Sequence, residues 1–103
     1  MLHDRQITDI AERIAKGQLP GADLQRVVTE RATDSDGKDA VRITLVLAPA
    51  SVEALTGDAA LDLLVELQSA LEMEGEERLP IVEYATEAEL QEAQSGGEPA
   101  GDE

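Results

Sequence analysis

The sequence contains no cysteine, no phenylalanine and no tryptophan, and its single tyrosine is Tyr84. Without cysteine the chain forms no disulfide and no thiol-ligated zinc or iron–sulfur site. Its core must be built from Ala, Val, Leu and Ile, because the aromatic side chains that fill many interiors are missing. A cysteine-free chain suits a reducing compartment, so we expect a cytoplasmic protein.

Long apolar runs and basic residues are also scarce. The longest apolar stretch, residues 43–50, is too short to cross a bilayer, and the polar residues at the start predict no signal peptide. The formal net charge is −15, and residues 51–103 hold fifteen acids against one base, Arg78. Such a field repels nucleic acids and anionic membranes and attracts basic protein surfaces. We therefore expect a basic protein partner, no nucleic acid and no membrane.

The apolar content, 42% of 103 residues, is sufficient for one domain with a modest core. Periodicity predicts six elements in the order α-β-β-α-β-α: helix 3–16, strands 24–32 and 40–48, helix 58–74, strand 79–85 and a short helix to about residue 94. The fold class is therefore α+β, with a small antiparallel sheet of about three strands (hairpin plus one) and helices packed on one face. We expect residues 1–94 to form this single domain and residues 95–103 to be a disordered acidic tail.

Local signals define several boundaries. Gly37, after Asp36, predicts a hairpin turn between the first two strands, since glycine accepts a positive φ. Thr86 and Glu89 have the spacing of a capping box. Thr56 or Asp58 is expected to cap helix 58–74. The expected buried face of that helix comprises Ala60, Leu61, Leu64, Leu67 and Leu71, joined by Leu63 and Val65.

The motifs of common catalytic and metal sites are missing or incomplete. Asp34 and Asp36 resemble part of a calcium loop, but placing Gly37 at the sixth position puts Ala32 first and Ile43 twelfth, where acids are required. The single histidine, His3, has no expected partner group. No phosphate-binding loop or serine-hydrolase motif occurs. We expect no enzyme, no catalytic residue, no metal site and no cofactor.

The most unusual feature is the acidic charge of helix 58–74 and the segment that follows it. Acids recur there at four-residue spacing, where like charges destabilise a helix, and the helix contains no base. A dense acidic cluster then leads into the third strand. The candidate partner-binding residues are therefore Asp58, Asp62, Glu66, Glu72, Glu74, Glu76 and Glu77.

These features favour a non-catalytic interaction module that binds a basic surface of a protein partner. Three alternatives stay open. The acids can be a solvated surface that serves solubility or suits a salt-rich host. The chain can be an accessory subunit or assembly factor that docks through an exposed sheet edge, where a homodimer can also form. It can also be a small-ligand-binding domain with a pocket between helix and sheet, although the missing aromatic and basic residues disfavour this.

Overall fold

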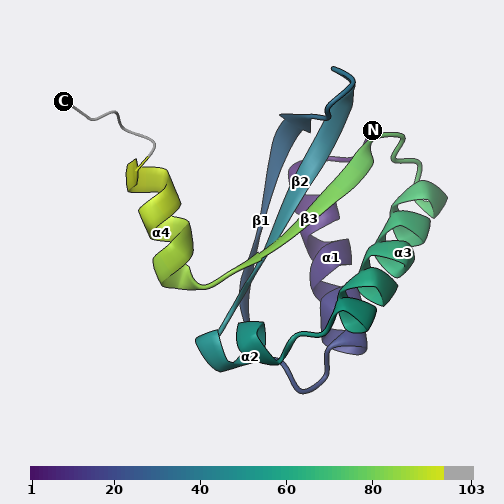
Figure 1. Cartoon of the computed structure of the whole chain (residues 1–103). Coiled ribbons are helices and arrows are strands. Elements are labelled where there is room, and N and C mark those ends of the chain that lie inside the picture. Colours follow the sequence, from purple (N-terminus) through teal and green to yellow (C-terminus); the bar gives the residue numbers. More distant parts are fainter. Residues whose placement is uncertain (97–103) are drawn as a thin grey trace.

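A computed structural model describes residues 1–96 of the chain (Figure 1). Its elements are α1 (Asp4–Gln18), β1 (Leu24–Thr33), β2 (Asp39–Leu47), α2 (Pro49–Ala54), α3 (Gly57–Met73), β3 (Leu79–Ala85) and α4 (Glu87–Gly96). The predicted α+β class is confirmed, and one short helix, α2, is added to the six expected elements. The predicted disordered tail begins too early, because residues 95 and 96 belong to α4, and its residues 97–103 lie outside the described residues.

The three strands form one sheet in the order β1-β2-β3. β1 and β2 make the predicted antiparallel hairpin, in which Val27 lies opposite Leu45. β3 runs parallel to β2, with Val82 beside Ile43, so the prediction of an antiparallel sheet is wrong for its third strand. The connection explains this difference. α2 and α3 return the chain to the end of the sheet where β2 begins, and such a crossover gives parallel strands.

The turn and cap residues act as their sequence patterns predict. Gly37 has a φ of 83°, and the Asp34 side chain accepts two backbone hydrogen bonds of 2.9 Å across the same turn. Thr56, rather than Asp58, caps α3 by accepting a 3.1 Å bond from a backbone N–H. Thr86 and Glu89 exchange two hydrogen bonds, of 2.9 and 3.1 Å, at the start of α4. These short-range bonds fix where the turn and the two helices begin.

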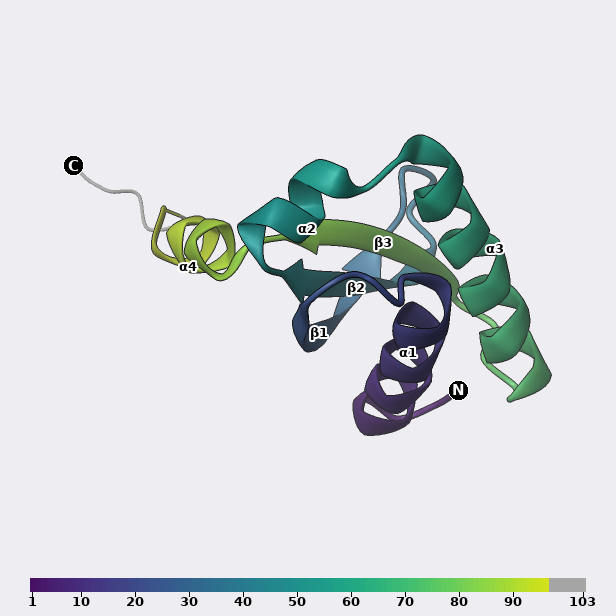
Figure 2. The same cartoon turned by 90° about the horizontal axis from the view of Figure 1, so that it is seen from below.

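α1 and α3 lie side by side on one face of the sheet, as Figure 2 shows, and the core fills the space between these layers. Only small and branched apolar side chains form its buried centre, while Tyr84 packs at its margin. The centre consists of Ile7, Ile10, Ala11, Ala15, Val41, Ile43, Leu45, Leu63, Leu67 and Leu71.

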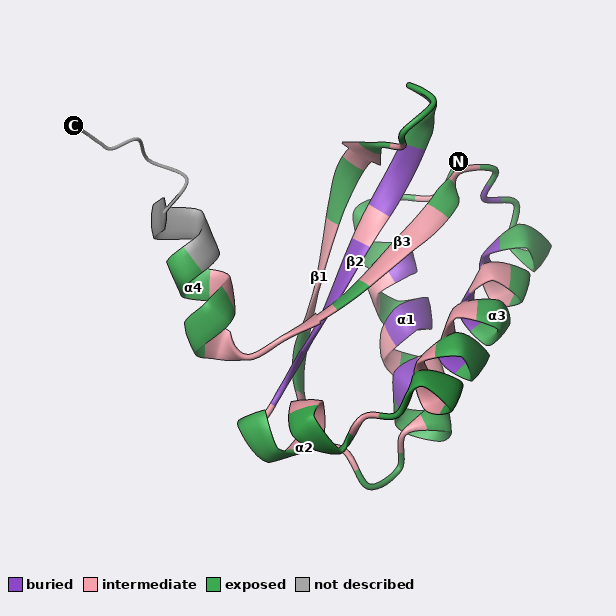
Figure 3. Ribbon diagram, in the orientation of Figure 1, coloured by how far each residue is buried: buried purple, intermediate pink, exposed green. Residues whose placement is uncertain are grey.

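The orientation of α3 differs from the predicted one. Leu63, Leu67 and Leu71 are buried, whereas Leu61 and Val65, expected in the core, are 59% and 58% exposed. Figure 3 shows this contrast as buried and exposed colours on opposite sides of the helix. Apolar residues occur around most of α3, so several orientations satisfy the spacing. Packing against α1 selects one of them.

α1 and α3 do not cover the opposite face of the sheet, and α4 contacts β2. Arg42, on β2, lies between Glu30 of β1 and Glu83 of β3, with N–O separations of 3.5 and 3.6 Å. α4 stands apart from α1 and α3 (Figures 1 and 2). It is tied to the sheet by an ion pair of 2.7 Å between Arg26 and Glu87, and this exposed pair contributes little to stability.

Candidate interaction surface

The seven acids chosen from the sequence do not share one environment. Six of them are exposed and available to a partner: Asp58, Asp62, Glu66, Glu72, Glu74 and Glu77. Glu76 is only 2% exposed, so the structure removes it from the predicted binding surface. The physical reason is the turn that ends α3. Gly75 takes a φ of 97°, and the Glu76 N–H then bonds the carbonyl of Leu71 at 2.9 Å.

Glu76 has a structural role in this arrangement. Its carboxylate accepts bonds of 3.0 Å from the Arg78 guanidinium at both oxygens, and further bonds of 2.9 Å from the backbone N–H groups of Arg78 and Leu2. The Arg78 side chain, with help from those two N–H groups, lowers the pKa of Glu76 to about 2 against the opposing effect of burial. The bonds join the N-terminal segment to the loop before β3.

The exposed acids of α3 form a row along the helix. Asp58, Asp62 and Glu66 recur every four residues, and the helix contains no Lys or Arg. Glu66 lies at a shallow groove between α1 and α3 that Arg13 and Met73 also line. Arg13 of α1 therefore lies near Glu66, at one end of the row.

Exposed apolar side chains accompany this row, and sequence reasoning missed them. Leu61 and Val65 are also four residues apart on α3, and Met73, near its end, is 87% exposed. We define the outer side of α3 as Asp58, Leu61, Asp62, Val65 and Glu66. The available sequence signal was the number of apolar residues in α3, which exceeds what one buried stripe accommodates.

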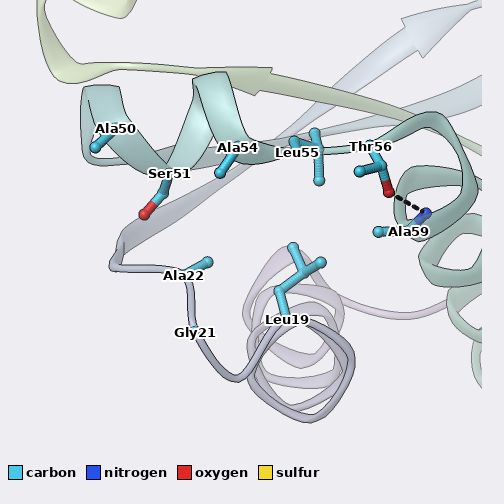
Figure 4. A pocket seen from close by; sticks show the side chains of 9 residues that line it. All are labelled: Leu19, Gly21, Ala22, Ala50, Ser51, Ala54, Leu55, Thr56 and Ala59. Carbon is cyan, nitrogen blue, oxygen red and sulfur yellow. Dashed lines mark hydrogen bonds between the residues drawn. The ribbon is translucent and has the colours of Figure 1, made fainter.

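A second hollow feature lies at the end of the molecule where α3 begins (Figure 4). A cavity of about 380 Å³ lies between the segment after α1, helix α2 and the start of α3. We call it the α2 cavity. Its lining residues are Leu19, Gly21, Ala22, Ala50, Ser51, Ala54, Leu55, Thr56 and Ala59.

The lining of the α2 cavity is small and apolar apart from two hydroxyl groups. Both already accept backbone hydrogen bonds: Ser51 Oγ from Asp23 N–H at 2.9 Å, and Thr56 Oγ1 from Ala59 N–H at 3.1 Å. No charged side chain lines the cavity. Its chemistry therefore suits an apolar group better than a charged ligand. The sequence gives little sign of it, because three distant segments form its walls.

Both outer edges of the sheet are free within residues 1–96. β1 and β3 each pair only with β2 there. The free edge of β3 runs beside α3, which packs against that strand. Unpaired backbone groups along such an edge can bond an added strand.

Other candidate groups are isolated. In the part of the chain that the structure describes, no group of three or more His, Asp or Glu side chains is placed to hold a metal ion. No helix within residues 1–96 is long and apolar enough to cross a membrane. The backbone N–H of His3 donates a 3.0 Å bond to Gln6 at the start of α1. Burial raises the pKa of Tyr84, whose hydroxyl has no hydrogen-bond partner among these residues.

Comparisons with protein-family models, with curated proteins and with solved structures give no match to this chain. Its function is therefore inferred from its own geometry. The features that bear on it are the outer side of α3, the α2 cavity and the free sheet edges.

Proposed function

We propose that the chain is a non-catalytic interaction module that binds a basic surface of a protein partner through the outer side of α3. One observation carries the proposal. Acids at four-residue spacing accompany two apolar side chains that are more than half exposed, on a helix without a single base. Exposed apolar groups with charged neighbours are typical of docking surfaces, and the sign of the charge favours a basic partner.

The two kinds of residue have different roles in such contact. Fully burying an aliphatic side chain contributes about 1.5–3 kcal/mol. Leu61 and Val65 are each more than half exposed, so a partner that covers them can gain much of this free energy. Asp58, Asp62 and Glu66 contribute less to affinity. Their field speeds the approach of a basic surface and disfavours acidic competitors.

A second candidate function is that of an accessory subunit or assembly factor that docks through a sheet edge. The free edges of β1 and β3 within the described residues favour it, because a partner strand or a second copy of the chain can extend the sheet there. Backbone pairing resists salt, whereas attraction between exposed charges is screened within about 10 Å at 0.1 M salt. The salt dependence of binding therefore separates the two candidates.

The small-ligand alternative has weaker support. The sequence-based interpretation places a ligand pocket between helix and sheet, but the α2 cavity lies between a loop and two helices. It also offers no charged group to orient a polar substrate. An absence of catalysis and a cytoplasmic location stay predictions.

Copurification at low salt, with the bound proteins identified, tests the proposed function. The test variant combines Asp62→Lys with Glu66→Lys on α3, and the matched control combines Asp36→Lys with Glu92→Lys. Asp36 lies in the hairpin turn and Glu92 on α4, both exposed, so the two variants change net charge equally at different places.

We expect the control to retain a set of basic proteins that the α3 variant loses and that salt releases from the parent chain. Loss from both variants would show that overall charge, rather than α3, attracts these proteins. Retention by both variants at high salt would favour the sheet edge over α3.

A further inference from the structure

Hydrogen bonds join the walls of the α2 cavity. The Ala48 N–H bonds the Asp23 carbonyl at 3.1 Å, and the Asp23 N–H bonds Ser51 Oγ at 2.9 Å. These bonds join α2 to the segment that precedes β1. On the other side of the cavity, Thr56 caps α3. Walls that are joined by hydrogen bonds lose less conformational freedom when a ligand binds.

The α2 cavity is large enough to hold an apolar side chain. It measures about 380 Å³, whereas an engineered apolar cavity of about 150 Å³ in another protein already binds benzene. Its walls include Gly21, Ala22, Ala50, Ala54 and Ala59, where larger residues would fill the space. The lining residues Ala50 and Ala54 are exposed, so the cavity is open to solvent.

Three acids are sequence neighbours of residues that line the α2 cavity, and we call them the rim acids. Asp23 follows Ala22, Glu53 precedes Ala54 in α2, and Asp58 precedes Ala59 at the start of α3. All three acids are exposed. Asp58 is also the first acid on the outer side of α3, so the rim and that side meet at this residue. An apolar group that enters the cavity is favoured when its flanking residues are basic.

From the cavity and its rim, we infer that the α2 cavity receives one aliphatic or aromatic side chain from a Lys- and Arg-rich segment of the partner protein. This inference rests on the proposed function and specifies how the same partner is anchored. The apolar side chain fills the cavity, and the neighbouring bases lie near the rim acids and the row along α3. An apolar anchor in a pocket ringed by polar groups is the arrangement that concentrates binding free energy.

A second copy of the chain fits the cavity less well. Met73 is its most exposed large apolar side chain, and it lies between Glu72 and Glu74. Inserting Met73 would bring two carboxylates near the three rim acids, and like charges at an interface are costly. The formal net charge of −15 on each copy likewise favours a basic partner over self-association.

Selection from a phage-displayed library of random linear peptides tests the inference with a defined probe. The parent chain should enrich peptides with one apolar residue flanked by Lys or Arg. In a synthetic peptide of that sequence, replacing the apolar residue by Ser should weaken binding about tenfold or more. Ala54→Leu fills the cavity from an exposed position. It should weaken binding of the original peptide by a similar factor and change binding of the Ser peptide little.

Two further variants complete the design. Ala50→Leu fills the cavity from a second exposed position, so the result does not depend on one substitution. Ala88→Leu adds the same side chain at an exposed position of α4 that does not line the cavity, and should leave peptide affinity unchanged. Circular dichroism checks that each variant is folded.

The outcomes separate the two proposals. If basic peptides are enriched but neither Ala54→Leu nor the Ser replacement changes their affinity, the cavity inference is overturned and the proposed function is not. If the enriched peptides depend on the cavity but contain no bases, or if no peptide is enriched, the proposal of a Lys- and Arg-rich partner segment is overturned. A dimer of the parent chain in sedimentation equilibrium that Ala54→Leu abolishes would assign the cavity to a second copy instead.

Discussion

The two sides of α3 contain the same kinds of residue in opposite environments. Leu63 and Leu67 are at most 1% exposed, whereas Leu61 and Val65, two positions earlier in each case, are more than half exposed. The buried pair meets α1 and the sheet, and the exposed pair meets solvent among acids. Apolar character alone therefore does not identify the core of this helix. Contact with α1 decides which leucines belong to it.

Acidic residues divide in the same way. Glu76, in the loop after α3, is buried against Arg78, while Asp62 and Glu66 face outward on the helix. The inward direction of Glu76 depends on the positive φ of Gly75. One acid thus stabilises the fold and the others are free for recognition. Four predictions test this division, beginning with the largest expected effect.

Glu76→Ala should lower the free energy of unfolding by about 3–5 kcal/mol, because it leaves the Arg78 guanidinium buried without its partner. Glu72→Ala, which removes an exposed acid nearby, should change it by less than about 0.5 kcal/mol. Urea unfolding followed by circular dichroism measures both. Equal losses would show that Glu76 is no more important to the fold than a surface acid.

Leu67→Ala should lower the free energy of unfolding by about 2–5 kcal/mol, since it opens a cavity in the core. Leu61→Ala removes the same atoms from an exposed position and should cost well under 1 kcal/mol, about the size of a surface change. Leu64→Ala, at a half-buried position, should fall between them. A larger loss for Leu61→Ala than for Leu67→Ala would reverse the assigned sides of α3.

Acid should remove the stabilisation that Glu76 provides. Its folded-state pKa of about 2 lies below its ordinary value of 4.5, so the unfolded chain binds the proton first as pH falls. The contribution is complete above pH 4.5 and disappears between 4.5 and about 2. The difference in unfolding free energy between the parent and Glu76→Gln should shrink across that range. A difference that is independent of pH would contradict an ionised Glu76 in the folded state.

The smallest effect is expected from Asp62→Lys combined with Glu66→Lys. The change at position 62 turns repulsion from Asp58 into attraction, while positions 62 and 66 stay a like-charge pair, so stability should rise by a few tenths of a kcal/mol at low salt. The gain should vanish at high salt, because screening removes the repulsion it relieves. Thermal unfolding at two salt concentrations measures it. A loss above about 1 kcal/mol would mean that these side chains pack against the protein instead of facing solvent.

Features that depend on neighbouring residues could be predicted from the sequence. The turn at Gly37, the cap at Thr56 and the reciprocal bonds of Thr86 and Glu89 all join residues within a few positions. Their partners are therefore visible in the printed sequence. The hairpin follows from the same local signals and from the alternation along β2.

Features that depend on distant partners could not be predicted in this way. The parallel pairing of β3 depends on the path of α2 and α3, and the orientation of α3 depends on α1. Glu76 appeared to belong to an acidic surface because its bond to Leu2 joins positions 74 residues apart. The same limit applies to the candidate site. Its exposed acids could be read from the sequence, but its apolar neighbours and the α2 cavity required the packed structure.

The bond between Leu2 and Glu76 also has a consequence for synthesis on the ribosome. α1 and the hairpin emerge first, yet their apolar faces are covered by α3, and the N-terminal segment is held by a loop made much later. Until α3 emerges, Val41, Ile43 and Leu45 of β2 lack the leucines of that helix that complete their core. The core therefore closes only after α3 has been made, and a chain interrupted before α3 exposes apolar strand residues to chaperones and to other nascent chains.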